Sequence, residues 1–90
     1  MHLTCQIYPM ARISVGSDKD GALVRLGEAI RARRKALRLS QEALSDAAEI
    51  DRSHMGKIER GERNVTILNI LRIGNALECQ ASDLLRDSGL

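Results

Sequence analysis

Four positions between residues 51 and 60 have side chains suited to contacting nucleic-acid bases. If this stretch is a helix, Arg52, Ser53 and Lys57 lie away from its apolar side. Arginine can form two hydrogen bonds to guanine, serine can bond several bases, and lysine reaches guanine or a phosphate. Gly56 falls in the same row, where its missing side chain either lets DNA come close or is simply tolerated. We therefore predict base-reading residues at Arg52, Ser53, Gly56 and Lys57, with ordinary solvation as the alternative for Arg52.

Two short helices joined by a tight turn must hold these side chains in place. Ser40 can cap the first helix and Asp51 the second, because both residue types accept hydrogen bonds from backbone amides. Met55 and Ile58 recur at helical spacing, and Gly61 ends the second helix. The unit, residues 40–60, has the organisation of a helix-turn-helix, and its helices are too short to stand without neighbours.

The residues of this unit resemble those of the Cro and phage-repressor type helix-turn-helix family, the XRE family. The letters SQE at 40–42 and IERG at 58–61 match its pattern, with Leu44, Ala48, Ile50 and Arg52 between them. The likeness runs from about residue 23 to residue 85. It implies an all-α fold, a compact five-helix bundle of the lambda-repressor-like DNA-binding type.

Besides Gly56, a mid-helix glycine that costs roughly 1 kcal/mol relative to alanine, two residues depart from the family pattern. Glu49 stands where the turn usually has glycine, so a left-handed backbone there costs roughly 1 kcal/mol. Val65 stands where proline is common, so the loop after the second helix is expected to be less rigid. Neither departure overturns the fold.

An arginine on the expected first helix falls at the edge of the core. The apolar face of that helix passes through Arg34, which needs a partner there, and Glu59 lies near the inward face of the base-reading helix. The resemblance implies that these two positions form an ion pair. An arginine fork suits a carboxylate bidentately, so we expect a structural role for Glu59 rather than a DNA contact. His54 is expected to be structural or peripheral.

Positive charge is concentrated in one segment, although the net charge is only +2. Residues 31–38 hold five of the cations, which beside a helix-turn-helix are expected to meet a phosphate backbone. Without that unit, a solvated helix face would be the preferred reading. The resemblance implies that Gln41 touches phosphate and can brace the first base-reading residue. The candidate phosphate contacts are Arg31, Lys35, Ser40, Gln41, Arg60, Arg63 and Asn64, with solvated loop charges as the alternative for the last three.

The first residues of the chain, 1–16, show no helical period and are predicted to form an arm that is flexible or ties a dimer. Residues 11–15 could form a strand, or the native protein could begin at Met10, without residues 1–9. The domain is expected over residues 17–87, with a first helix from Ser17 or Asp18 to Leu37 and a tail at 88–90.

The segment after the helix-turn-helix is predicted to close the bundle with two helices. Thr66 can cap the fourth helix, and a residue at or near Ser82 can cap the last. The fourth helix is expected to be mostly core, with Ile67, Ile70, Leu71, Ile73, Ala76 and Leu77 as its apolar residues. Leu84, Leu85 and Leu90 are candidates for a dimer seam.

Composition excludes several classes of function. Ninety residues allow one small domain, and no segment approaches the roughly 20 apolar residues needed to span a bilayer. No secretory signal is evident, so we expect a cytoplasmic protein. The cysteines, Cys5 and Cys79, have no metal-site spacing, and Cys79 is expected to be a small buried hydrophobe. We expect no metal or cofactor, and no enzyme, because no nucleophile lies beside a base.

The main hypothesis is that the protein is a sequence-specific regulator of transcription, with repression as the favoured direction of control. We expect it to bind double-stranded DNA as a homodimer, because one such helix contacts few bases and two-fold symmetric operators match protein dimers. The alternative is an antitoxin-type interaction protein that binds a toxin through residues 1–20 or the last helix. RNA binding through stacked bases is disfavoured, because Tyr8 is the one aromatic residue.

Overall fold

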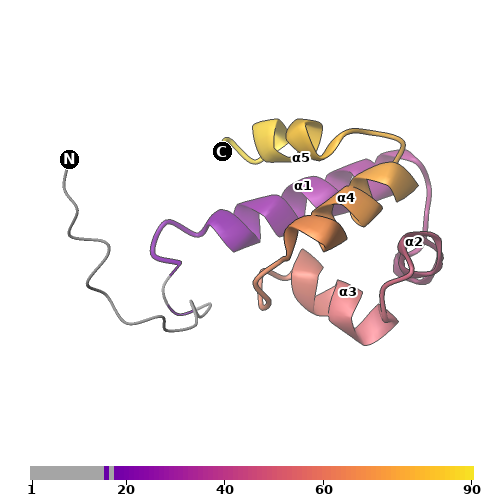
Figure 1. Cartoon of the computed structure of the whole chain (residues 1–90), viewed down its shortest axis with the longest axis horizontal. Helices are drawn as coiled ribbons and strands as arrows, with labels where there is room; N and C mark the ends of the chain where they lie inside the picture. Colours follow the sequence, from indigo (N-terminus) through magenta and orange to yellow (C-terminus); the bar gives the residue numbers. More distant parts are fainter. Residues whose placement is uncertain (1–15, 17) are drawn as a thin grey trace.

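The structure is a computed structural model that describes residue 16 and residues 18–90, and helices are the dominant element there. The described part contains α1 (Ala22–Ala36), α2 (Gln41–Ala48), α3 (Arg52–Glu59), α4 (Ile67–Ala76) and α5 (Ala81–Asp87) (Figure 1). Within these residues there is no strand, which confirms the predicted all-α fold of five helices. The strand considered for residues 11–15 and the predicted arm, apart from residue 16, lie outside the described residues.

Side-chain caps begin the three middle helices as predicted. The hydroxyl of Ser40 accepts from the Ala43 amide at 2.9 Å, and the Asp51 carboxylate accepts from the His54 amide at 3.3 Å. The Thr66 hydroxyl caps α4 in the same way. Each cap supplies an acceptor to an amide that has no partner inside its helix, which sets where the helix starts.

The first helix begins later than predicted, and the last helix begins near its predicted cap. α1 starts at Ala22 rather than at residue 17 or 18, because Gly21 adopts a left-handed conformation with φ 67°. The Asp18 carboxylate still caps this helix, at 2.9 Å from the Ala22 amide. α5 starts at Ala81 with Gln80 as its N-cap residue, and the backbone amide of Gln80 donates to the Asp83 carboxylate at 2.9 Å. The cap of α5 therefore lies two residues before Ser82, at one of the nearby residues that the prediction allowed.

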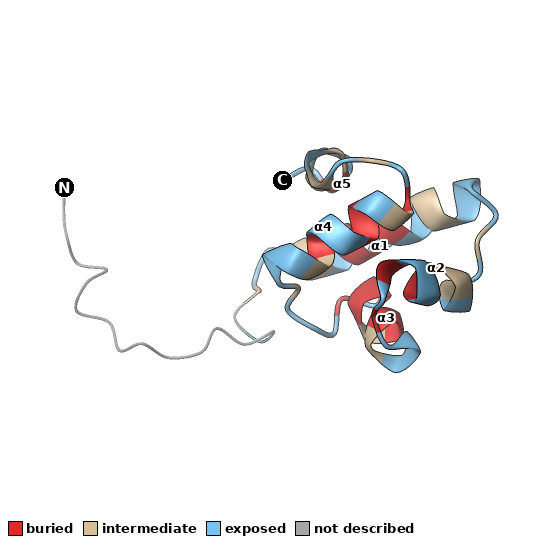
Figure 2. Cartoon of the chain, turned by 45° about the vertical axis from the view of Figure 1, so that its right-hand side comes forward, coloured by how far each residue is buried: buried red, intermediate tan, exposed pale blue. Residues whose placement is uncertain are grey.

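The core is formed by apolar side chains from all five helices. α1 lies between α3 on one side and α5 on the other, while α2 contacts α3 and α4 (Figure 1). Colouring by burial places the buried residues on the facing sides of these helices (Figure 2). The fully buried apolar side chains are Ile30, Leu44, Met55, Ile58, Ile73 and Leu84. Leu84 is thus a core residue, and its prediction as part of a dimer seam was wrong.

The fourth helix has an exposed apolar face that the sequence pattern did not predict. Ile67, Leu68 and Leu71, the α4 apolar face, are 64%, 63% and 51% exposed. The predicted burial of Ile67 and Leu71 is wrong, because α4 turns Ile70 and Ile73 toward the core. Positions 67, 68 and 71 share the opposite side of a helix with 3.6 residues per turn.

The first and third helices pack closely where α1 carries a glycine. A β-carbon on Gly27 would lie 2.6 Å from the Ile58 carbonyl oxygen and 2.8 Å from the Glu59 carbonyl carbon. Only glycine fits such a distance, since real β-carbons essentially never approach backbone below 3.0 Å. This contact holds the end of α3 against α1. Among the described helices, none is both long and apolar enough to cross a membrane.

Candidate nucleic-acid interface

The turn between α2 and α3 orients α3, the predicted base-reading helix. Glu49 adopts the left-handed conformation expected at this position, with φ 58°, and its amide donates to the Asp46 carbonyl at 3.2 Å. A residue other than glycine takes this conformation at a cost of about 1 kcal/mol. Ile50 follows as a buried residue whose amide donates to the Ser45 carbonyl at 3.0 Å. The buried Ile50 anchors the turn in the core.

The four predicted base-reading residues border one open hollow of about 530 Å³ on the surface of α3. Arg52 and Ser53 are exposed at the start of the helix, and Lys57 is half-buried one turn later. Gly56 is buried beneath them. The full lining of this α3 hollow is Gln41, Asp51, Arg52, Ser53, Gly56, Lys57 and Arg60. Two or more of these side chains can therefore contact neighbouring groups of one ligand.

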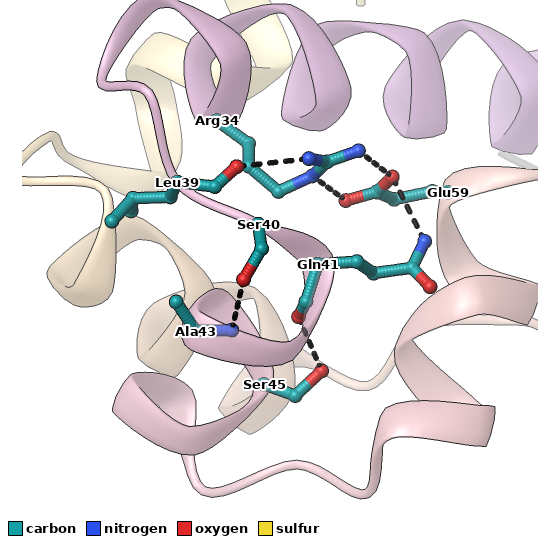
Figure 3. A network of polar contacts seen from close by, with 7 residues as sticks. All are labelled: Arg34, Leu39, Ser40, Gln41, Ala43, Ser45 and Glu59. Atoms are coloured by element: carbon teal, nitrogen blue, oxygen red, sulfur yellow. Dashed lines mark hydrogen bonds and ion pairs between the residues drawn. The ribbon is translucent and has the colours of Figure 1, made fainter.

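A buried ion pair joins α1 to the end of α3. The Arg34 guanidinium donates to both carboxylate oxygens of Glu59, from Nε at 2.7 Å and from Nη2 at 3.0 Å (Figure 3). Its Nη1 donates to the Leu39 carbonyl at 3.0 Å. The two side chains are only 11% and 3% exposed. This is the pair that the family resemblance implied, in the bidentate form that suits an arginine fork.

The Gln41 side chain extends this pair toward the surface. Its amide Nε2 donates to Glu59 Oε1 at 3.1 Å, and Figure 3 shows the amide oxygen turned away from Glu59. This bond was not predicted from the sequence. A glutamine amide can donate a hydrogen bond to a buried carboxylate. No sequence pattern, however, links two residues that lie eighteen positions apart.

A second hollow, of about 240 Å³, lies between α1 and α3. This α1–α3 hollow is lined by Arg31, Arg34, Gln41, Glu59 and Arg60. Because Arg34 neutralises Glu59, the charge left among the lining residues is that of Arg31 and Arg60, and Arg60 also forms an exposed pair with Glu62. A hollow lined with arginines and an amide suits an oxyanion such as a backbone phosphate.

The structure brings together three of the seven candidate phosphate contacts, namely Arg31, Gln41 and Arg60. Lys35, Arg63 and Asn64 are exposed but line neither hollow, and the hydroxyl of Ser40 caps α2. Arg60 donates to Glu62 at 3.1 Å, and this guanidinium holds the pKa of the Glu62 carboxyl below its usual value.

The remaining reactive groups do not form a second site. His54 Nε2 is buried and has no hydrogen-bond partner among the described residues. This is consistent with an imidazole ring that packs against its neighbours. Cys79 is half-buried, and burial raises the pKa of its thiol, which favours the protonated form. The described residues include no group of three or more metal-binding side chains placed to hold an ion.

Comparison with known proteins gives a consistent result. A helix-turn-helix family model matches residues 30–84. The control protein C.SmaI of Serratia marcescens is 37% identical over 65 residues, which cover 72% of this chain and 77% of that protein. The solved restriction-modification controller protein C.AhdI of Aeromonas hydrophila is 44% identical with a TM-score of 0.68, over 69% of this chain and 94% of that one.

A more distant structure shows the same fold. The clp gene regulator ClgR of Corynebacterium glutamicum is 22% identical, with a TM-score of 0.73 over 76% of this chain and 72% of that one. Helices α2 and α3 therefore form the helix-turn-helix that their residues predict. The chain belongs to the Cro and phage-repressor type helix-turn-helix family and is a DNA-binding transcription regulator.

Proposed function

We propose that this regulator is the controller protein of a restriction-modification system and acts as a homodimeric repressor. The observation that carries the proposal is the 44% identity to a restriction-modification controller along 94% of that protein's chain. The antitoxin alternative is not favoured, because the relatives described above are controller and regulator proteins. A dimer bound to its operator would repress by covering the DNA that the transcription machinery needs.

Each helix of the interface has a separate task in this proposal. In a helix-turn-helix the start of the second helix enters the major groove, so Arg52 and Ser53 contact base edges. Lys57 reaches a guanine or a phosphate farther along the groove. Arg31 and Arg60 bind the backbone from the α1–α3 hollow. Phosphate contacts set the position of the protein on the duplex, and base contacts select the sequence.

The α4 apolar face is the proposed dimer interface. Ile67, Leu68 and Leu71 lie together on one side of α4 and are more than half exposed. Contiguous exposed apolar side chains often mark an interaction surface. A second copy presenting the same face would bury both in a two-fold symmetric contact. This face is proposed in place of the predicted seam at Leu84, Leu85 and Leu90, of which Leu84 is buried in the core.

A surface substitution tests the dimer. We expect Leu68→Asp to convert the protein to a monomer in sedimentation-velocity analysis without unfolding it, because residue 68 is 63% exposed. Leu37→Asp is the matched control, since Leu37 is also an exposed apolar residue, 42% exposed, at the end of α1. A Leu68→Asp variant that remains dimeric would rule out this face.

Selection from a random pool of DNA tests the operator. The purified protein is incubated with the pool at near-physiological salt, where non-specific phosphate binding is suppressed. We expect an enriched inverted repeat with one half-site per subunit. Enrichment of single half-sites would contradict the dimer. No enrichment, together with a second chain that copurifies from the native host, would favour the antitoxin alternative.

A further inference from the structure

Gly56 is buried in the middle of α3, on the side of the helix that carries Arg52 and Lys57. Glycine is among the poorest helix formers, so it weakens α3 by its presence. The base-reading prediction treats it as a place where DNA comes close. The structure shows that other side chains of the protein already occupy the space above its backbone.

Two polar side chains converge on Gly56. A β-carbon at this position would lie 3.1 Å from Nη1 of Arg60 and 3.3 Å from Oε1 of Gln41. The carbon of the Gln41 amide lies 3.8 Å from the same point. Gln41 comes from the start of α2 and Arg60 from the end of α3, so the bare backbone of Gly56 is where the two side chains meet.

Both side chains are held in this position by bonds to carboxylates. Gln41 Nε2 donates to Glu59 at 3.1 Å, and Glu59 is itself held by Arg34. Arg60 Nε donates to Glu62 at 3.1 Å. A β-carbon at residue 56 would require Gln41 or Arg60 to shift by a few tenths of an ångström. A larger side chain would compete with both for the same space, and we expect it to move Gln41 from Glu59 or Arg60 from Glu62.

The Gln41 and Arg60 side chains lie between the two hollows of the candidate interface. Both Gln41 and Arg60 line the α3 hollow and the α1–α3 hollow, so they form the wall between the base-reading helix and Arg31. An amide nitrogen carries two hydrogens, and Glu59 accepts one of those of Gln41. The second amide hydrogen and the Nη groups of Arg60 are donors of the kind that bind phosphodiester oxygens.

We propose that Gly56 is a positioning residue for DNA binding. By lacking a side chain, it lets the Gln41 amide and the Arg60 guanidinium lie together against α3, where they bind one backbone phosphate jointly. This inference rests on the proposed function, because it requires that this face binds duplex DNA. It assigns Gly56 an indirect role through Gln41, and not direct contact with a base.

A double-mutant cycle between residues 56 and 41 tests the proposal. Gly56→Ala and Gly56→Leu are made in the wild-type protein and in Gln41→Ala, and affinity is measured for a random-sequence DNA duplex at fixed low salt. We expect Gly56→Leu to weaken binding by about tenfold or more, the effect of one lost hydrogen bond to a charged group. In Gln41→Ala the same change should weaken binding less than about threefold, because coupled residues are non-additive.

Gly56→Ala separates the positioning role from folding. Alanine favours the helix, and its β-carbon meets only the ends of flexible side chains, so the melting temperature should stay level or rise. DNA affinity should nevertheless fall, by less than for leucine, and by less again when Gln41 is absent. If Gly56→Leu fails to fold by circular dichroism, this variant decides the test alone.

Two results would overturn the inference while leaving the proposed function intact. Equal losses with and without Gln41 would show that bulk at residue 56 obstructs DNA directly. Unchanged affinity in the position-56 variants would show that the two side chains do not bind phosphate from this position. If the wild-type protein bound no duplex DNA, the proposed function would fail as well, and the wild-type measurement distinguishes the two cases.

Discussion

Two adjacent arginines on α1 form ion pairs in contrasting surroundings. Arg34 binds Glu59 through two hydrogen bonds, with the side chains 11% and 3% exposed. Arg33 binds Asp87 on α5 through Nε at 2.6 Å, with the side chains 36% and 37% exposed. The first pair ties α1 to α3, and the second ties it to α5.

The difference between the pairs is one of solvation rather than of charge. Exposed pairs contribute little to stability because water and salt screen them. A buried pair gives up its hydration, so removing one partner leaves the other charge stranded in the interior. The Arg34–Glu59 pair also holds Gln41. We therefore expect the buried pair to govern both the packing of α3 and the donors at its surface.

The largest effect is expected from Glu59→Ala. This change leaves Arg34 buried without its carboxylate and should destabilise the fold by roughly 3 to 5 kcal/mol. For a domain of this size, the melting temperature should fall by more than about 12 °C in thermal unfolding followed by circular dichroism. Arg34→Ala should act in the same direction, and an unchanged melting temperature in both variants would show that the pair contributes nothing.

A double replacement identifies the cause of that loss. Arg34→Met combined with Glu59→Leu removes both charges and keeps apolar volume, so it should recover most of the stability lost in Glu59→Ala. DNA binding should stay impaired in the double variant, because Gln41 then has no carboxylate to hold it. Failure to recover stability would indicate that packing of α3, and not the stranded charge, is responsible.

An intermediate effect is expected from Gly27→Ala. The added β-carbon would meet the backbone of residues 58 and 59, which cannot yield as a side chain can. Overpacking of this kind costs about 1 to 3 kcal/mol and would push α3 away from α1. Chemical denaturation of Gly27→Ala beside Gly21→Ala separates this clash from backbone strain, because Gly21 has no atoms within 4 Å of a β-carbon. Equal losses in the two variants would refute the close approach.

The smallest effect is expected at the exposed pair, and it depends on pH. The Arg33 guanidinium donates to Asp87 and lowers the pKa of that carboxyl. A carboxyl with a lowered folded-state pKa stabilises the fold above its unfolded pKa, and this contribution is lost as pH falls through the folded pKa. Asp87→Asn should therefore lower the melting temperature slightly at neutral pH and have no effect in strong acid.

The matched background for this test is Arg33→Gln. Without the guanidinium, Asp87 loses the hydrogen bond that lowers its pKa, so Asp87→Asn should change the melting temperature little at any pH. A pH-independent effect of Asp87→Asn would show that Asp87 stabilises α5 by some means other than this pair.

Local chemistry made much of the fold predictable from the sequence. The caps at Ser40, Asp51 and Thr66 follow from residue type and position. The left-handed turn at Glu49 followed from the family pattern, which usually has glycine there. Helical periodicity identified the central core residues, because the buried face of a short helix repeats at three and four residues. The Arg34–Glu59 pair depended instead on the family pattern.

The parts that were missed depend on contacts between distant segments. Periodicity marks Ile67 and Leu71 as apolar, but which side of α4 faces the core is decided by α2 and α5. Gln80 caps α5 although glutamine is a weak capping residue by type. The approach of the Gln41 and Arg60 side chains to Gly56 was also missed, because no local spacing in the sequence relates residue 41 to residues 56 and 60.

The most direct test of the account compares Arg52→Ala with Arg31→Ala on two DNA duplexes. The wild-type protein and both variants are titrated with the selected operator and with a scrambled duplex of the same length, at one salt concentration. We predict that Arg52→Ala loses about 1 to 3 kcal/mol of preference for the operator, because base contacts carry discrimination. Arg31→Ala should weaken binding to both duplexes alike. Equal discrimination by the wild-type protein and Arg52→Ala would contradict the assignment of Arg52 as a base-reading residue.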